Sequence, residues 1–132
     1  MAFASVEIIN ILNKIKYPYN INILTQEQAL KTIEKWDQVK KWVQILLNER
    51  EKLIQELEKL SIVQHIYPTD SNFVLVKVKN ANETYNYLVD NGIIVRNRSS
   101  VSLCQGCLRI TVGTTTENKV LIDQLKKNLL TV

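Results

Sequence analysis

The chain has 132 residues, of which 45% are hydrophobic and 23% are charged. These values describe one soluble domain with enough apolar material for a single core. The net charge of +4 comes from interspersed acidic and basic residues, and no aromatic–basic module accompanies it, which argues against nucleic-acid binding. The apolar stretches are short and interrupted by charge, and no signal peptide is present. We therefore expect a cytoplasmic protein without a transmembrane helix.

The first predicted element is a helix over about 6–15. Ser5 has the character of an N-cap residue, and apolar residues follow it at helical spacing. The turn-rich segment 16–22 ends this helix, because the residue before Pro18 disfavours helical backbone.

A second, much longer helix is predicted over 25–60. Thr25 and Gln28 have the spacing of a capping box, and no Gly or Pro occurs between them and Leu60. Apolar residues recur at intervals of three and four: Trp36, Val39, Val43, Leu46, Leu53, Leu57 and Leu60. Such a helix would span roughly 50 Å at 1.5 Å per residue, more than one small domain can cover. We therefore expect this helix either to form a coiled coil or to pack against a protein segment that this chain does not contain.

The second half alternates between strand and helix patterns. Strands are predicted over about 62–66, 72–78, 93–96 and 108–112, and a loop over about 97–106. Helices are predicted between Asn80 and Gly92, and from Thr116 as a weak N-cap through Leu129. We therefore expect an α+β fold: a long N-terminal helix followed by a small, mostly antiparallel sheet with helices on one face.

The cysteine and histidine residues offer few candidate catalytic or metal-binding sites. Cys104 and Cys107 form a C-x-x-C pair, which can be redox-active or supply half of a zinc site. The pair precedes a strand rather than a helix, so chance spacing is favoured, with Cys107 a small buried residue. His65, the sole histidine, has no identifiable catalytic partner and is expected at an edge or surface. Gly113–Thr114 could present N–H groups to an anion, but more simply ends a strand.

Three arginines carry the most informative pattern. Arg109 lies inside an apolar strand, and alternation places it on the face opposite Leu108 and Ile110. A charge there must be paired, exposed, or used for a ligand. A guanidinium binds a carboxylate through two parallel hydrogen bonds, which suits the orientation of an amino-acid substrate. Spacing alone favours a ligand-binding role and a solvated surface arginine equally.

Several segments together resemble histidinol-phosphate aminotransferases. Gly106–Thr114, with Gly92–Arg96 upstream, resembles the end of that family and is its most specific part here. Asn72–Val76 resembles the family's Asn-Phe strand, and Pro18–Asn22 its crossing segment into a long interdomain helix. Residues 2–9 resemble the segment after its phosphate-binding arginine. The resemblance covers almost the whole chain.

The resemblance implies pyridoxal-phosphate chemistry, in which an amino group moves between glutamate and imidazole-acetol phosphate in histidine biosynthesis. It implies that Arg109 holds the substrate α-carboxylate, and that Arg96 faces the phosphate of histidinol phosphate. Arg98 lies in a variable loop and receives no role. Residues 1–24 correspond to a remnant and crossing segment of the large domain, and residues 25–132 to the C-terminal small domain with the interdomain helix.

The same resemblance implies that this chain is incomplete. The family's Schiff-base lysine and other cofactor-holding residues lie in the large domain, upstream of this segment. We therefore assign no catalytic, cofactor-binding or metal-binding residue here, and expect the isolated chain to bind no cofactor and to be inactive. Its uncovered apolar surface predicts a homo-oligomer, for example a dimer. The alternative is a non-enzymatic α+β interaction or dimerisation module, and a third possibility, weak nucleic-acid binding, rests on charge alone.

Overall fold

The computed structural model describes residues 3–17 and 21–128. The chain divides into two compact units, residues 1–39 and residues 40–132. None of the helices in the described ranges combines the length and apolarity needed to cross a membrane.

The first unit is helical. Helix α1 (Val6–Ile15) begins after Ser5, as predicted. Helix α2 (Ile23–Glu34) begins earlier than predicted, because Asn22 rather than Thr25 is its N-cap: the Asn22 side chain accepts a hydrogen bond of 2.8 Å from the Thr25 N–H. Neither helix has a buried residue. Pro18, which was expected to end α1, lies outside the described residues.

The prediction of one continuous helix over 25–60 is wrong. Helix α2 ends at Glu34, and α3 (Trp36–Glu58) begins after Lys35, whose φ of −101° and ψ of 29° are not helical. In the last turn of α2, the Thr32 hydroxyl donates to the Gln28 carbonyl at 2.8 Å. Such side-chain bonds to the preceding turn bend helices, and they leave no Gly or Pro signal in the sequence.

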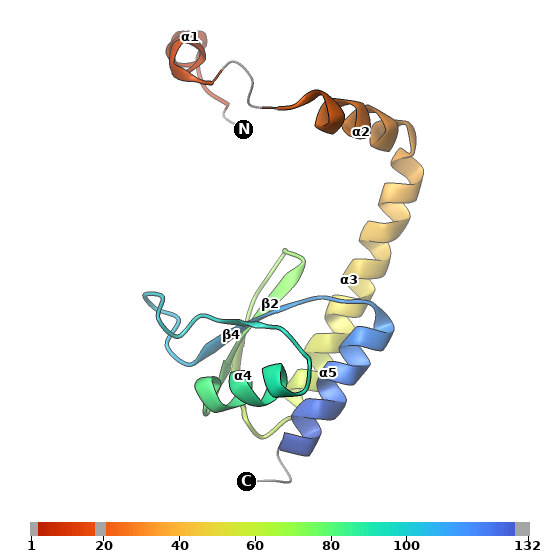
Figure 1. The fold of residues 1–132 in the computed structure, drawn as a ribbon, viewed down its shortest axis with the longest axis vertical. Helices are drawn as coiled ribbons and strands as arrows, with labels where there is room; N and C mark the ends of the chain where they lie inside the picture. Colours follow the sequence, from red (N-terminus) through yellow and green to blue (C-terminus); the bar gives the residue numbers. More distant parts are fainter. Residues whose placement is uncertain (1–2, 18–20, 129–132) are drawn as a thin grey trace. The chain divides into compact units, whose positions relative to one another are not determined.

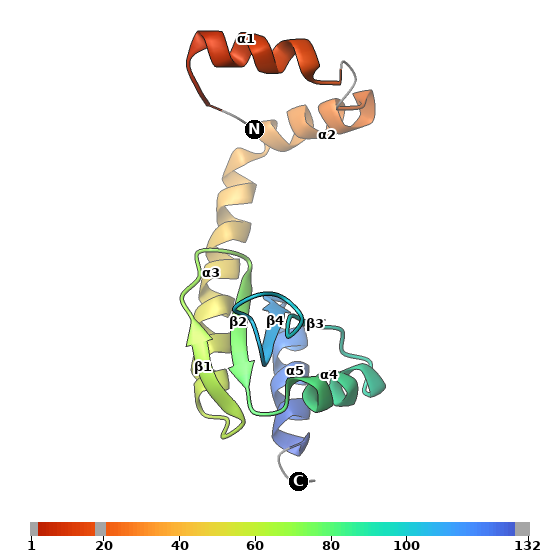
Figure 2. The same ribbon diagram turned by 90° about the vertical axis from the view of Figure 1, so that its left-hand side faces the viewer.

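The second unit contains an antiparallel sheet with the order β1-β2-β4-β3. Its strands are β1 (Val63–Tyr67), β2 (Phe73–Val78), β3 (Arg96–Asn97) and β4 (Cys107–Thr111). Helices α4 (Ala81–Asp90) and α5 (Thr115–Asn128) join α3 in packing against it. Figure 1 shows these elements, and Figure 2 shows them after a turn of 90°, with the sheet in front of α3 and α5. The predicted α+β class, with helices on one face of the sheet, is confirmed.

The core lies between the sheet and these helices. Val74 and Val76 of β2 are fully buried opposite Ile110 and Leu108 of β4. They meet apolar side chains from the three helices: Leu53, Leu57, Leu88, Leu121, Ile122 and Leu125. Each fully buried aliphatic side chain stabilises the fold by about 2 kcal/mol. Because these residues alternate along their strands, the residues between them must point to the opposite face of the sheet.

The strand predicted over 93–96 is reduced to the two residues of β3. Helix α4 ends in a Schellman motif, with Gly92 at a φ of +75°. The Ile93 N–H donates to the Leu88 carbonyl at 2.8 Å. This N–H therefore caps the helix instead of pairing with a strand, and pairing with β4 begins at Arg96.

Helix α5 is capped at Thr114, not at Thr116 as predicted. The Thr114 N–H and hydroxyl both donate to Glu117 Oε2 at 2.8 Å, and the Glu117 N–H donates back to the Thr114 hydroxyl at 3.4 Å. This is a capping box, which satisfies N–H groups that the first helical turn leaves free. Leu129, predicted at the end of this helix, lies outside the described residues.

Candidate functional site

The sheet face opposite the helices, called here the open face, carries one row of side chains across all four strands. Tyr67 lies opposite Leu75, Leu75 opposite Arg109, and Arg109 opposite Arg96. Because side chains alternate along a strand, this row points away from the core residues Val76 and Leu108. Figure 2 views the sheet from this side. The two arginines that the sequence singled out are therefore neighbours.

Arg109 occupies an unusual environment for a charged side chain. It is half-buried, and its Nε atom is fully buried without a hydrogen-bond partner. The guanidinium carbon lies 5.1 Å from the ring centre of Phe73, in a cation–π arrangement. The ring offsets part of the desolvation cost, but it cannot accept the Nε–H bond in the guanidinium plane. Arg109 thus keeps a buried donor that a ligand can satisfy.

Arg96 adds a second positive charge directly opposite Arg109. Like charges at opposed sheet positions are destabilising. Within residues 3–17 and 21–128, no carboxylate forms an ion pair with either arginine. Arg96 is exposed, so its side chain is free to approach a bound molecule. Two adjacent guanidinium groups and a buried free donor can together bind an anion.

Arg98 lies near this pair without joining it. Its backbone N–H donates to the Cys107 carbonyl at 2.9 Å, which continues the β3–β4 pairing. Its side chain forms no ion pair with the described residues. The geometry gives its guanidinium no role.

The histidine and cysteines form no metal site. Among the described residues, no group of three or more His, Cys, Asp or Glu side chains is placed to hold a metal ion. His65 is exposed on the edge strand β1, with its ring 4.6 Å from that of Tyr67 in an edge-to-face arrangement. Cys107 is fully buried at the start of β4. Both placements match the predictions.

The N-terminus of α5 is already occupied by the chain's own side chains. The Gly113 N–H donates to Asn118 Oδ1 at 2.9 Å, and the Thr114 N–H is bonded to Glu117. The Thr114 backbone and hydroxyl bonds hold the pKa of Glu117 below its ordinary value. Asn118 also reaches the buried carboxylate of Glu49, 3.3 Å away. These N–H groups are not available to an external anion.

Glu49 is buried but charged. Its carboxylate lies 2.9 Å from the ammonium group of Lys52, and the pKa of Glu49 is lowered, first by that hydrogen bond and less by bonds to Thr115 and Asn118. Sequence reasoning missed this polar contact between α3 and α5. Glu49 lies three residues after Leu46 and four before Leu53, so helical spacing places it on the buried face of α3. Its polar partner on α5 has no signature in local spacing.

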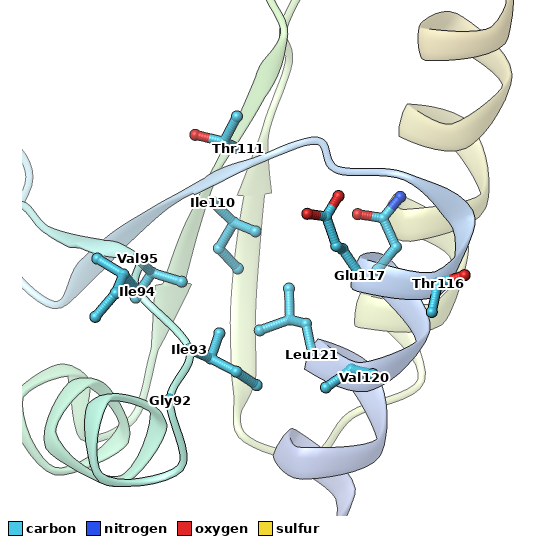
Figure 3. Close-up of a pocket in the computed structure, with 11 residues that line it drawn as sticks. Gly92, Ile93, Ile94, Val95, Ile110, Thr111, Thr116, Glu117, Val120 and Leu121 are labelled. Carbon is cyan, nitrogen blue, oxygen red and sulfur yellow. The ribbon is translucent and has the colours of Figure 1, made fainter.

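A cavity of about 370 Å³ lies between residues 92–95 and α5. Figure 3 shows Ile93, Ile110 and Leu121 facing it, with Glu117 near its rim. It opens on the helix side of the sheet, opposite Arg109, because Ile110 and Arg109 point to different faces. Two of its polar side chains, Glu117 and Asn118, are already bonded within the α5 cap. The arginine pair, and not this cavity, is the better candidate site.

Comparison with known proteins places the chain in a family. The sequence model of the family described as aminotransferase class I and II matches residues 1–125. The chain belongs to the class I and II aminotransferases. A histidinol-phosphate aminotransferase of Bacteroides thetaiotaomicron is 56% identical over 127 residues, which are 96% of this chain and 37% of the relative. One of Flavobacterium psychrophilum is 52% identical over 124 residues, with 94% of this chain and 36% of the relative covered.

A solved aminotransferase shares the fold. The histidinol-phosphate aminotransferase of Clostridium acetobutylicum matches with a TM-score of 0.86 at 21% identity, covering 96% of this chain and 39% of that one. The chain therefore spans less than two fifths of the length of the aminotransferases that it matches.

Sequence reasoning missed two features of the arginine site. Phe73 was noted only as part of the Asn-Phe resemblance, and its ring contact with Arg109 was not predicted. The opposition of Arg96 and Arg109 depends on the register between β3 and β4, which the Schellman motif at Gly92 helps to set. Local periodicity carries no information on that register.

Proposed function

We propose that this chain is the C-terminal small-domain portion of a cytoplasmic histidinol-phosphate aminotransferase, and that Arg109 binds the α-carboxylate of its amino-acid substrate. The observation that carries the proposal is the buried, unpartnered Nε atom of Arg109. The high identity to proteins named histidinol-phosphate aminotransferase supports the substrate class. The reaction would transfer an amino group between glutamate and imidazole-acetol phosphate.

Arg109 suits a carboxylate because of how it is held. Phe73 supports the guanidinium plane from one side, and the sheet fixes the side-chain stem. A planar carboxylate can then accept two parallel hydrogen bonds, one of them from Nε. A rigid donor set loses little conformational entropy on binding. The role of Arg109 is thus to orient the substrate.

Arg96 is proposed to bind the phosphate group of histidinol phosphate. Its side chain is exposed and lies on the same face as Arg109, so one substrate molecule could contact both guanidinium groups. A phosphate carries more negative charge than a carboxylate and is well matched to a mobile guanidinium. Its charge would also relieve the repulsion between the two arginines.

The described residues do not form a site for pyridoxal 5′-phosphate by themselves. No lysine in the described ranges is buried, and the N–H groups at the start of α5 are bonded to Glu117 and Asn118. We infer that the cofactor is held by the part of the aminotransferase that corresponds to the unmatched length of the relatives. The isolated chain should therefore be inactive when pyridoxal phosphate is added.

A chimera tests the proposal. The segment of the Bacteroides thetaiotaomicron relative that aligns with this chain is replaced by this chain, and transamination is measured. Loss of a charged, two-bond contact costs about 3 kcal/mol, so Arg109→Gln should lower kcat/KM for glutamate by roughly a hundred-fold. Arg98→Gln removes the same charge from the same region and should change kcat/KM for glutamate little. Equal losses for both variants would contradict the role of Arg109.

The same chimera separates the role of Arg96. Arg96→Gln should raise KM for histidinol phosphate, with a much smaller effect on KM for glutamate, because only the first substrate carries a phosphate. The free 132-residue chain with added pyridoxal phosphate serves as a further arm and should show no turnover. Turnover by the free chain would overturn the inference that the cofactor is held elsewhere.

A non-enzymatic interaction module remains the second candidate. It is favoured by the many exposed apolar side chains of the first unit, among them Ile11, Ile15 and Leu30. An inactive chimera that folds and self-associates would favour this candidate.

A further inference from the structure

The loop between β3 and β4 is built from three consecutive turns. Val101 donates its N–H to the Arg98 carbonyl, Cys104 to Val101, and Cys107 to Cys104, at 2.9, 3.0 and 3.0 Å. The bond from the Arg98 N–H to the Cys107 carbonyl closes the loop at its base. Both cysteines are thus held by backbone hydrogen bonds in an ordered segment.

The last turn brings the two cysteines together. A β-turn holds its first and fourth Cα atoms within about 7 Å, and disulfides join Cα atoms roughly 4.4–6.8 Å apart. Gly106, at a φ of +75°, provides the left-handed residue at the third position of this turn. Leu103 takes the same position in the preceding turn at a φ of 64°, which is strained for leucine. Both cysteines are free thiols.

The Cys107 thiol is itself held within this turn. Its Sγ–H donates to the Gln105 carbonyl oxygen, 3.8 Å away. Burial raises the pKa of the Tyr67 hydroxyl, and the two thiols raise it further. Cys107 lies opposite Lys77 and two positions before Arg109 in β4, so alternation directs its side chain to the open face.

We propose that Cys104 and Cys107 form a peroxide-responsive dithiol pair that closes to a disulfide. Cys104 is half-buried and Cys107 fully buried, so peroxide reaches Cys104 first. The Cys104 thiolate attacks a peroxide oxygen: an S–O bond forms, the O–O bond breaks, and the hydroxide released takes up the proton that the thiol lost and leaves as water. The Cys107 thiolate then attacks the Cys104 sulfur, forming the S–S bond and releasing a second water. Two thiols are oxidised and one peroxide is reduced.

The disulfide would fix the loop beside the arginine pair. Cys107 is bonded through its backbone to Arg98 and lies in the strand that carries Arg109. In a reducing compartment such a bond is transient and fits redox sensing rather than structural stapling. The proposal does not depend on the proposed aminotransferase role, because it rests on the turn that joins the two cysteines.

The experiment treats the reduced 132-residue chain with hydrogen peroxide and follows its intact mass and free thiols. We expect the two thiols per chain to disappear together, with loss of two hydrogen atoms and without dimers linked between chains. Dithiothreitol should restore both thiols. Accumulated sulfinic acid, disulfides between chains, or two thiols that persist would each overturn the proposal.

Two single-cysteine variants assign the order of the steps. Cys107→Ser should trap a sulfenic acid on Cys104 that reacts with dimedone. Cys104→Ser should keep its thiol under the same peroxide treatment, because Cys107 is buried. Thermal unfolding followed by circular dichroism checks that both variants are folded. Fast oxidation of Cys107 in a folded Cys104→Ser protein would contradict the assigned order.

Discussion

At the scale of single residues, the guanidinium of Arg109 contributes little to the stability of the folded chain. The Nε–H is desolvated without an acceptor, and Arg96 lies directly opposite. Among residues 3–17 and 21–128, it is the contact with the Phe73 ring that offsets part of these costs. Residues that bind ligands are often unfavourable for stability in this way, because their best partner is absent from the chain.

Replacing Arg109 with methionine should therefore stabilise the chain. Methionine keeps an apolar stem against Phe73 but removes the unsatisfied donor and the repulsion with Arg96. We expect the free energy of unfolding to rise by about 1 kcal/mol in urea denaturation. Arg98→Met is the matched control and should change it by less than about 0.5 kcal/mol. A large loss of stability on Arg109→Met would mean that Arg109 is a structural residue.

The sequence could predict the face of Arg109 but not its surroundings. Alternation along an apolar strand predicts that Arg109 points to the other face of the sheet from Leu108 and Ile110, and the structure agrees. The neighbours Phe73 and Arg96 come from other strands, whose registers depend on distant turns. Family resemblance named the arginines, and only the structure placed them beside each other.

At the scale of elements, helix ends were harder to predict than helices. The capping box of α5 is visible in the sequence as Thr114-x-x-Glu117, whereas the predicted N-cap was Thr116. The close approach at Gly113 supports the observed cap, because a Cβ atom there would lie 2.9 Å from Glu117. The break at Lys35 has no such signature, since it follows from a hydroxyl–carbonyl bond within α2.

The capping box makes a pH-dependent contribution to stability. The folded pKa of Glu117 lies below its ordinary value of 4.5. Ionised Glu117 therefore stabilises the fold above that value, and the contribution is lost as the pH falls through the folded pKa. We expect Glu117→Gln to be less stable than the parent chain at pH 7, and the two free energies of unfolding to converge below about pH 4.5.

Glu51→Gln is the control for that titration. Glu51 is exposed on α3 and has no hydrogen bond or ion pair with the described residues. Its replacement should leave the pH dependence of unfolding parallel to that of the parent chain. If Glu117→Gln were also parallel, the Thr114 bonds would not depend on the charge of Glu117.

At the scale of the whole molecule, the two units differ in how well they bury apolar side chains. The second unit has a closed core between sheet and helices. In the first unit, no residue of α1 or α2 is buried. The apolar stripe of α3 is buried only toward the end of the helix, since Leu53 and Leu57 are buried whereas Trp36, and Val43 within the second unit, are more than half exposed. The sequence predicted this excess of apolar surface from the length of the stripe.

We expect the isolated chain to self-associate through this surface. Exposed apolar side chains favour association by about 25 cal/mol per Å² that is buried, and a stable interface needs roughly 1,000 Å². Sedimentation velocity should give a mass above that of the monomer, rising with concentration. Ile11 and Leu30 are 60% and 64% exposed, so Ile11→Glu with Leu30→Glu should restore the monomer. Val120→Glu replaces an exposed apolar residue of the second unit and should leave association intact; a parent chain that stays monomeric throughout would contradict the prediction.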